Sequence, residues 1–140
     1  CNLTTIPIAA GENIRGFDNF NNRIRNKTLG VIQPDICKWG GISGNLKIVR
    51  AILGNGIRYC PHFLGGGIGL IASAHLLAAV GGDGMLEVDF NINPLREGLA
   101  IPFPTLEDSK LSLHTGPGLG VTPNQFELNK YLVYEAEIIN

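Results

Sequence analysis

Four short apolar runs along the chain alternate with segments of helical periodicity. The runs cover residues 4–10, 30–33, 57–61 and 85–88. Each run is short and apolar, and polar residues or glycines follow it closely, which predicts a buried strand with a polar tip. The same polar and glycine-rich stretches separate the strands from the helical segments that follow them.

Helical periodicity fills the intervals between these strands. The predicted helices cover residues 17–27, 44–53 and 68–80. Apolar side chains recur three and four positions apart in the first two, which indicates amphipathic helices, and Ser43 is the expected N-cap of the second. The third is apolar or small on nearly every side, which predicts a helix packed between other layers.

The remainder of the chain carries weaker signals. Residues 89–104 are punctuated by Asp and Pro, which predicts a long surface excursion with Arg96 and Glu97 in solvent. A further strand is expected at residues 110–114. The pair Thr122-Pro123 predicts the N-cap and first turn of a final helix.

Polar residues at the strand ends are regularly spaced. Glu12, Asp35, His62 and Glu87 lie at intervals of 23, 27 and 25 residues. Such similar intervals indicate repeated β/α units. A closed eight-stranded barrel averages about 31 residues per unit. About four units therefore predict an α/β fold equivalent to half of a TIM-type barrel.

Composition narrows the possible partners. The chain has 140 residues, of which 44% are hydrophobic, enough for the core of one domain. A net charge of −1 argues against a nucleic-acid partner.

The location of the protein is indicated by its cysteines and its apolar runs. The three cysteines of the chain form neither a disulfide framework nor a metal motif, which favours the cytoplasm. The longest apolar run has 14 residues, too short to cross a membrane, and no signal peptide is apparent.

If the four strands are neighbours, about 4.8 Å apart, the strand-end residues meet at one mouth. Asp35 and His62 would form an acid–base dyad, Glu12 could bind a divalent cation, and Glu87 could donate a hydrogen bond to developing negative charge. For any one such residue, capping of the next helix or a salt bridge is the more common explanation. The four together at these intervals make a site as well supported as that explanation, whereas His75, among Ala and Leu, is expected to be structural.

Several motifs carry a resemblance to a known family. They are IPIAAGE at 6–12, QPD at 33–35, KWGGISG at 38–44, PH at 61–62, SAHLLAA at 73–79 and LE at 86–87. In order and spacing they resemble the C-terminal half of the barrel in the mandelate racemase subgroup of the enolase superfamily. The resemblance covers residues 4–133.

The resemblance implies a role for each strand-end residue. Glu12 corresponds to a ligand of an essential Mg²⁺, and Asp35 and His62 correspond to the general base dyad. Glu87 corresponds to the acid that hydrogen-bonds the enolate, and Lys38 to a further catalytic-site residue common in the family. The muconate-lactonizing relatives carry a lysine where this chain has Asp35, so the resemblance is to the racemase-like subgroup.

The resemblance also implies how the chain is organised. Residues 1–104 would be the part of the barrel with strands 5 to 8 of the parent fold, and residues 105–140 would pack on the barrel and a capping domain. The chain starts at Cys1 without an initiator Met, and we expect it to be incomplete. The missing N-terminal half or another chain would then complete the barrel, a homo-oligomer is expected, and the isolated chain is expected to be inactive.

The implied reaction is abstraction of the proton alpha to a carboxylate. We favour a Mg²⁺-dependent acid-sugar (aldonate) dehydratase, because one histidine that takes the α-proton can later help expel a β-hydroxyl. A racemase or epimerase of a 2-hydroxy acid is an alternative that needs a second base on the opposite face. A non-catalytic half-barrel that acts only in assembly or binding is the other.

Overall fold

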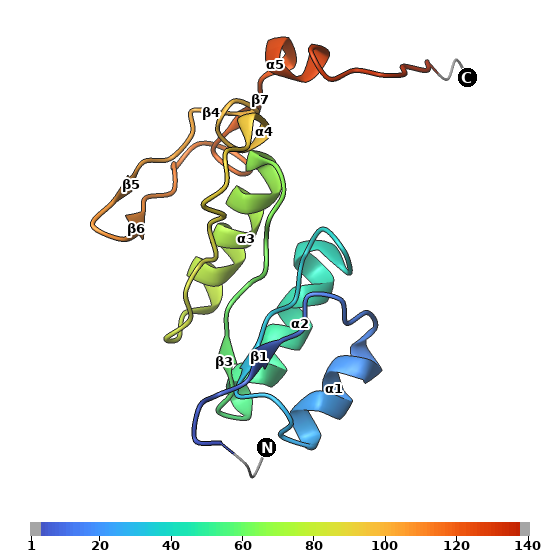
Figure 1. Ribbon diagram of the computed structural model, residues 1–140, viewed down its shortest axis with the longest axis vertical. Helices are drawn as coiled ribbons and strands as arrows, with labels where there is room; N and C mark the ends of the chain where they lie inside the picture. The colour runs from blue at the N-terminus through green and yellow to red at the C-terminus, as the bar shows by residue number, and fades with distance from the viewer. Residues whose placement is uncertain (1–3, 138–140) are drawn as a thin grey trace.

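A small parallel sheet organises the N-terminal part of the computed structural model, which describes residues 4–137 (Figure 1). Its strands are β1 (Ala9–Ala10), β2 (Val31–Ile32) and β3 (Arg58–Tyr59), paired in the order β1-β2-β3. In register, Ala9 pairs with Val31 and Val31 with Arg58. Backbone hydrogen bonds continue beyond the labelled strands, from Gln33 N to Ala10 O (2.9 Å) and from Cys60 N to Ile32 O (3.3 Å).

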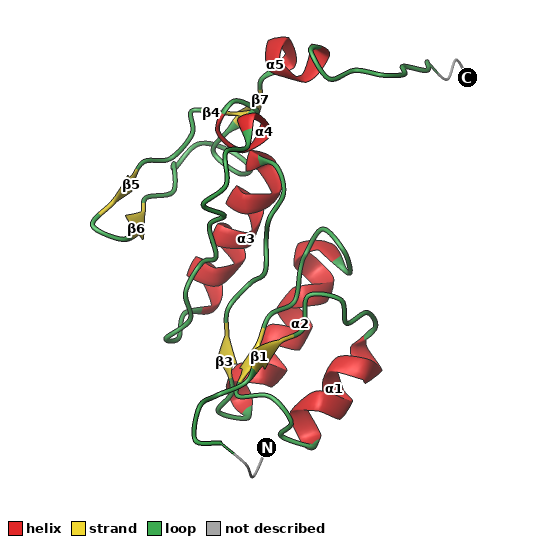
Figure 2. Cartoon of the chain, in the orientation of Figure 1, coloured by secondary structure: helices red, strands yellow, loops and turns green. Residues whose placement is uncertain are grey.

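Each strand is followed by a helix, which confirms the α/β prediction (Figure 2). The helices are α1 (Phe17–Arg25), α2 (Gly41–Gly54) and α3 (Gly67–Val80). Helix α2 packs between α1 and α3. A helix between two strands returns the chain to the same end of the sheet, so this order of elements is the one that parallel strands need.

The core lies between this sheet and the helices. Phe20 and Ile24 of α1, one helical turn apart, are buried against Ile48, Val49 and Ile52 of α2 and against the sheet. Asp18 in the first turn of α1 and Arg23 and Arg25 in its last turn complement the helix dipole.

The start of α2 differs from the prediction. Ser43 is not the N-cap, because the helix begins at Gly41, directly after Gly40 in a left-handed conformation (φ 74°). The side chain of Asn45 instead donates hydrogen bonds to the carbonyls of Trp39 and Gly41, at 2.6 and 2.8 Å. A buried amide on the second turn thus secures the start of this helix.

Helix α3 is buried on nearly all sides, as its composition predicted. Its first residue must be small, because a Cβ on Gly67 would lie 2.1 Å from the carbonyl oxygen of Arg96. Within residues 4–137, no helix combines the length and apolar character that a membrane crossing requires.

The predicted fourth strand at residues 85–88 is wrong. The chain does run beside β3 here, because a Cβ on Gly84 would lie 1.9 Å from Tyr59 O. However, Met85 N donates to the sulfur of Cys60 (3.4 Å), and Phe63 N donates to the Glu87 carboxylate (3.2 Å). Side chains replace main-chain carbonyls as acceptors, so no ladder forms and the sheet has three strands.

The C-terminal part extends away from the sheet (Figure 1). Its elements are α4 (Pro94–Glu97), β4 (Ala100–Ile101), β5 (Leu106–Glu107), β6 (Lys110–Leu111), β7 (Thr122–Pro123) and α5 (Gln125–Asn129). Strands β5 and β6 form a hairpin, and β4 pairs antiparallel with β7. The capping prediction for Thr122-Pro123 is therefore wrong, because these residues form β7 and Asn124 is the N-cap of α5.

Arg96 was predicted to be in solvent, and this is wrong. Its side chain is buried because Nη1 donates to the carbonyls of Asp89 and Asn91, while Nη2 pairs with Glu97 Oε1 at 2.8 Å. Glu97 itself is exposed, as expected. The guanidinium therefore holds the turn at residues 89–91 against α4.

We expect Arg96→Met to lower the free energy of unfolding by about 3 kcal/mol, because two backbone carbonyls lose the charged donor that binds them. Urea denaturation of the purified protein measures this change. The matched control is Arg58→Met, since Arg58 pairs with Asp83 in solvent and its loss should have a much smaller effect. Equal destabilisation by the two substitutions would contradict the structural role of Arg96.

Candidate active site

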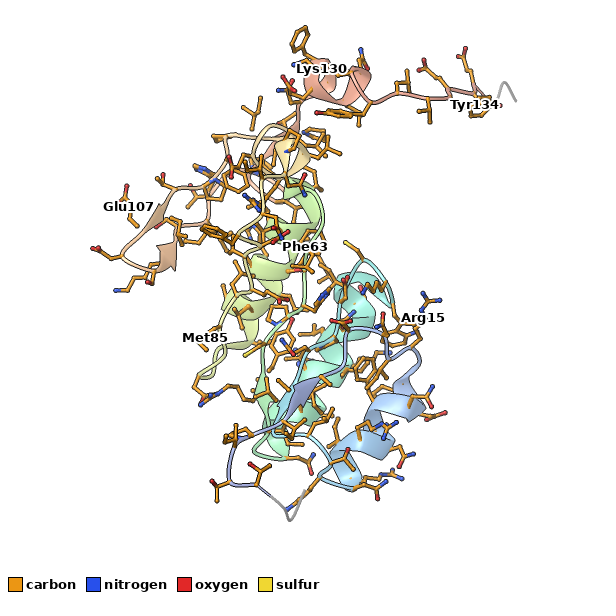
Figure 3. The ribbon with its side chains drawn as sticks, viewed as in Figure 1. Arg15, Phe63, Met85, Glu107, Lys130 and Tyr134 are labelled. Carbon is orange, nitrogen blue, oxygen red and sulfur yellow. The ribbon has the colours of Figure 1, made fainter. Side chains whose placement is uncertain are left out.

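Asp35 and His62 meet at the carboxyl ends of β2 and β3. His62 Nδ1 lies 3.0 Å from Asp35 Oδ2, and the two residues are only 7% and 6% exposed. His62 N donates to Pro34 O (3.3 Å), so the ladder continues to the dyad itself. Figure 3 labels the next residue, Phe63, near the middle of the molecule. The sequence prediction that these two side chains lie together agrees with this geometry.

The turn after β2 fixes the Asp35 carboxylate. Its Oδ1 accepts hydrogen bonds from the backbone N–H groups of Cys37 (2.8 Å) and Lys38 (3.1 Å). Because the carboxylate only accepts, His62 donates through Nδ1–H to Oδ2. This assignment of the tautomer leaves Nε2 as the nitrogen that exchanges a proton with the mouth of the site.

Glu12 reaches the same histidine from β1. Its Oε2 lies 3.2 Å from His62 Nε2, although the Glu12 side chain is 48% exposed. Gly11 permits this approach, because its φ is 141° and a Cβ would lie 2.8 Å from Gln33 N. The contact places the Glu12 carboxylate beside Nε2, the ring nitrogen that Asp35 does not bind.

Glu87 is placed differently from the other three. Its Oε2 accepts from Phe63 N at 3.2 Å, one residue beyond His62. The carboxylate lines a separate, smaller cavity of about 260 Å³ with Cys60 and Met85. The structure thus brings Glu12, Asp35 and His62 together and holds Glu87 beside them through the backbone.

A cavity of about 800 Å³ opens above the dyad. It is lined by Glu12, Asp35, Cys37, Lys38, His62, Phe63, Leu64, Gly65, Gly66, Ile68, Gly69 and Leu99. This volume is typical of a site for a small organic molecule. The sequence analysis did not identify Phe63 or Leu64 as lining residues, although their position next to His62 was a usable signal. It also missed Leu99, for which no local signal exists.

Three further residues that could carry chemistry have structural or inert environments instead. Burial, with a contribution from the nearby Asp35 charge, raises the pKa of the Cys37 thiol, which disfavours the nucleophilic thiolate. Trp39 packs on Phe20, with ring centroids 5.9 Å apart. His75 Nε2 contacts the carbonyl of Leu119 at 2.9 Å, the structural role expected for it.

The described residues fit only part of a metal site. Within residues 4–137, no group of three His, Cys, Asp or Glu side chains is arranged to hold a metal ion. Glu12 offers an exposed carboxylate at the mouth, whereas the Asp35 carboxylate is buried and held by the dyad and the turn. A hard divalent cation needs six oxygen ligands or more. Glu12 would therefore be one ligand of such a site, and the others would have to come from elsewhere.

Comparisons with curated proteins identify relatives that act on sugar acids and lactones. A family model described as "Enolase C-terminal domain-like" matches residues 2–127. D-galactarolactone cycloisomerase of Agrobacterium fabrum is 28% identical over 90% of this chain and 35% of its own length. Arabinonate dehydratase of Saccharolobus solfataricus is 30% identical over 84% of this chain and 31% of its own. The chain thus spans about a third of the length of these relatives.

Solved structures that resemble this chain belong to the same group of enzymes. A mandelate racemase/muconate lactonizing enzyme from Bordetella bronchiseptica is 50% identical, with a TM-score of 0.84 over 91% of this chain and 36% of its own. An enolase from Pantoea ananatis, solved with bound d-gluconate and Mg, is 27% identical, with a TM-score of 0.82 over 92% of this chain and 31% of its own.

Proposed function

This chain belongs to the enolase superfamily, and from that membership we propose that it forms part of a Mg²⁺-dependent enzyme that removes the proton alpha to the carboxylate of an acid sugar. The substrate would be an aldonate and the reaction a dehydration. The observation that carries the proposal is the Asp35–His62 dyad at a cavity of about 800 Å³, where the second ring nitrogen, Nε2, faces Glu12.

His62 performs both proton transfers in this proposal. Nε2 takes the α-proton, so the C–H electron pair enters an enediolate, while Asp35 retains the Nδ1–H bond and stabilises the imidazolium. The imidazolium then returns its proton to the β-hydroxyl, which leaves as water as the C–O bond breaks. The resulting enol becomes a 2-keto acid.

Glu12 would hold the cation with ligands from outside this chain. When bound, Mg²⁺ stabilises negative charge on the substrate carboxylate. Lys38, which lines the cavity, would bind a carboxylate or hydroxyl group of the substrate. Glu87 would reach the enediolate from the adjoining smaller cavity and donate a hydrogen bond through the oxygen that Phe63 N does not occupy. The Mg and d-gluconate bound to the Pantoea relative support a site that takes a divalent cation and a sugar acid.

The choice of dehydration over racemisation follows the relatives, several of which are named as sugar-acid dehydratases. Dehydration needs only the base that His62 supplies at the cavity. One histidine suffices to remove the α-proton and expel a β-hydroxyl, whereas a racemase or epimerase needs a second base on the opposite face. Arabinonate dehydratase among the relatives supports the same choice. The arrangement of the dyad argues against a half-barrel that serves only for assembly.

We extend the proposal to the organisation of the chain. Residues 1–104 would belong to the barrel, completed by further strands from the rest of the protein or another chain, in a cytoplasmic homo-oligomer. Residues 105–140 would pack on the barrel and a capping domain. Support comes from Phe126 in α5 and from Val133 and Tyr134 after it, which are 72%, 98% and 79% exposed.

The protein purified at its native length tests this function with a panel of aldonates and Mg²⁺ in D₂O. We expect 2-keto acid formation from at least one aldonate, with solvent deuterium in the product by NMR. Deuterium exchange with inversion at the α-carbon, and without a 2-keto acid, would instead identify a racemase. No turnover and no exchange across the panel would contradict the proposal.

A further inference from the structure

Five residues form a closed ring of hydrogen-bond contacts at the mouth of the cavity. Asn13 Nδ2 donates to Glu12 Oε1 (3.0 Å), and Lys38 Nζ donates to Asn13 Oδ1 (3.3 Å). Glu12 Oε2 contacts His62 Nε2, His62 Nδ1 contacts Asp35, and Asp35 Oδ1 accepts from Lys38 N. The ring joins the loops that follow all three strands, and Asn13 is its one side chain without an ionisable group.

The chemistry of its two neighbours fixes how Asn13 is oriented. A lysine ammonium can only donate and a carboxylate can only accept, so the amide oxygen must face Lys38 and the amide nitrogen must face Glu12. The Asn13 side chain is exposed, so packing does not hold it in place. The two hydrogen bonds therefore determine its conformation.

We propose that Asn13 is a positioning residue of the active site, acting on Glu12 and Lys38. By binding Oε1 of Glu12, it directs Oε2 toward His62 and the expected cation. By binding one ammonium proton of Lys38, it holds that side chain at the cavity mouth and leaves two donors for a substrate oxygen. This inference rests on the proposed function, because it assigns Asn13 to the same site.

The first test compares Asn13→Ala with Asn19→Ala in the protein of native length. Asn19 lies in α1, and its side chain bonds the carbonyl of Arg15, so it is a matched control. We expect Asn13→Ala to weaken Mg²⁺ binding by about tenfold in calorimetry without substrate, as for groups that orient metal ligands. We expect a similar fall in kcat/KM, with wild-type values for Asn19→Ala.

The second test asks whether Asn13 acts through Lys38. In a double-mutant cycle with Lys38→Met, residues that act together show non-additive effects. At saturating Mg²⁺, so that weaker metal binding through Glu12 does not enter, we expect Asn13→Ala to lower kcat/KM by less than about threefold when Lys38 is already replaced, against about tenfold when Lys38 is present.

Two outcomes would overturn the inference alone, provided that the wild-type protein binds Mg²⁺ and turns over an aldonate. These are Asn13→Ala behaving like Asn19→Ala, and the effects of Asn13→Ala and Lys38→Met simply multiplying. If the wild-type protein neither binds Mg²⁺ nor turns over any substrate, the proposed function and the inference fall together.

Discussion

Replacing His62 with Asn is expected to lower kcat for the dehydration by at least about 10³-fold. The amide of Asn is similar in size to imidazole and can still hydrogen-bond Asp35, but it cannot accept a proton at neutral pH. Both proton transfers assigned to Nε2 are then lost. Steady-state kinetics gives the effect on dehydration, and deuterium exchange at the α-carbon isolates the first transfer.

The control for this substitution is His75→Asn. His75 lies in α3 and binds the carbonyl of Leu119 rather than the cavity, so we expect a loss of stability with little change in kcat. Thermal melting of both variants separates misfolding from lost chemistry. An unchanged rate in a folded His62→Asn protein would contradict the assignment of this residue as the base.

Asp35→Asn should lower kcat by about 10³-fold through the tautomer of His62. The backbone N–H groups of Cys37 and Lys38 require an acceptor at the Oδ1 position, so the amide oxygen of Asn would lie there. The amide nitrogen would then face Nδ1 and donate to it. His62 would carry its proton on Nε2, where the free electron pair is needed.

The matched control is Asp83→Asn. Asp83 is exposed, and hydrogen bonds from Arg58 hold the pKa of its carboxyl below the usual value. Loss of this pair should leave kcat unchanged. A folded Asp35→Asn protein that keeps more than about a tenth of wild-type kcat would show that Asp35 does not set the tautomer.

Much of the site could be predicted because parallel strands follow a simple rule. A strand, a helix and a return strand place successive strand ends at one edge, so the regular spacing of Glu12, Asp35 and His62 predicted their proximity. The resemblance to the enolase superfamily, carried by the motifs at 33–35 and 38–44, is confirmed by the family match. So is the prediction that the fold corresponds to the C-terminal part of a TIM-type barrel.

The errors lie where distant residues decide the local structure. Residues 85–88 have the composition of a strand, but the acceptor for Met85 N is the sulfur of Cys60. The pair Thr122-Pro123 suits a helix start, but pairing with β4 makes it a strand. Arg96 is charged and lies among surface residues, yet backbone carbonyls from residues 89 and 91 bury it. No local pattern records such partners.

The hydrogen bond from His62 N to Pro34 O separates two properties of this protein. This backbone hydrogen bond holds His62 at a fixed distance from Asp35. The distance therefore depends on the register of the main chain and not on the side chains that line the cavity. Half of the residues that line the cavity, in contrast, lie at positions 63–69, where the side chains of Phe63, Leu64 and Ile68 take no part in the ladder. We therefore expect substitutions in this part of the cavity wall to change which substrate the cavity accepts while the proton-transfer geometry is inherited intact, so the proposed reaction and its substrate range can evolve independently.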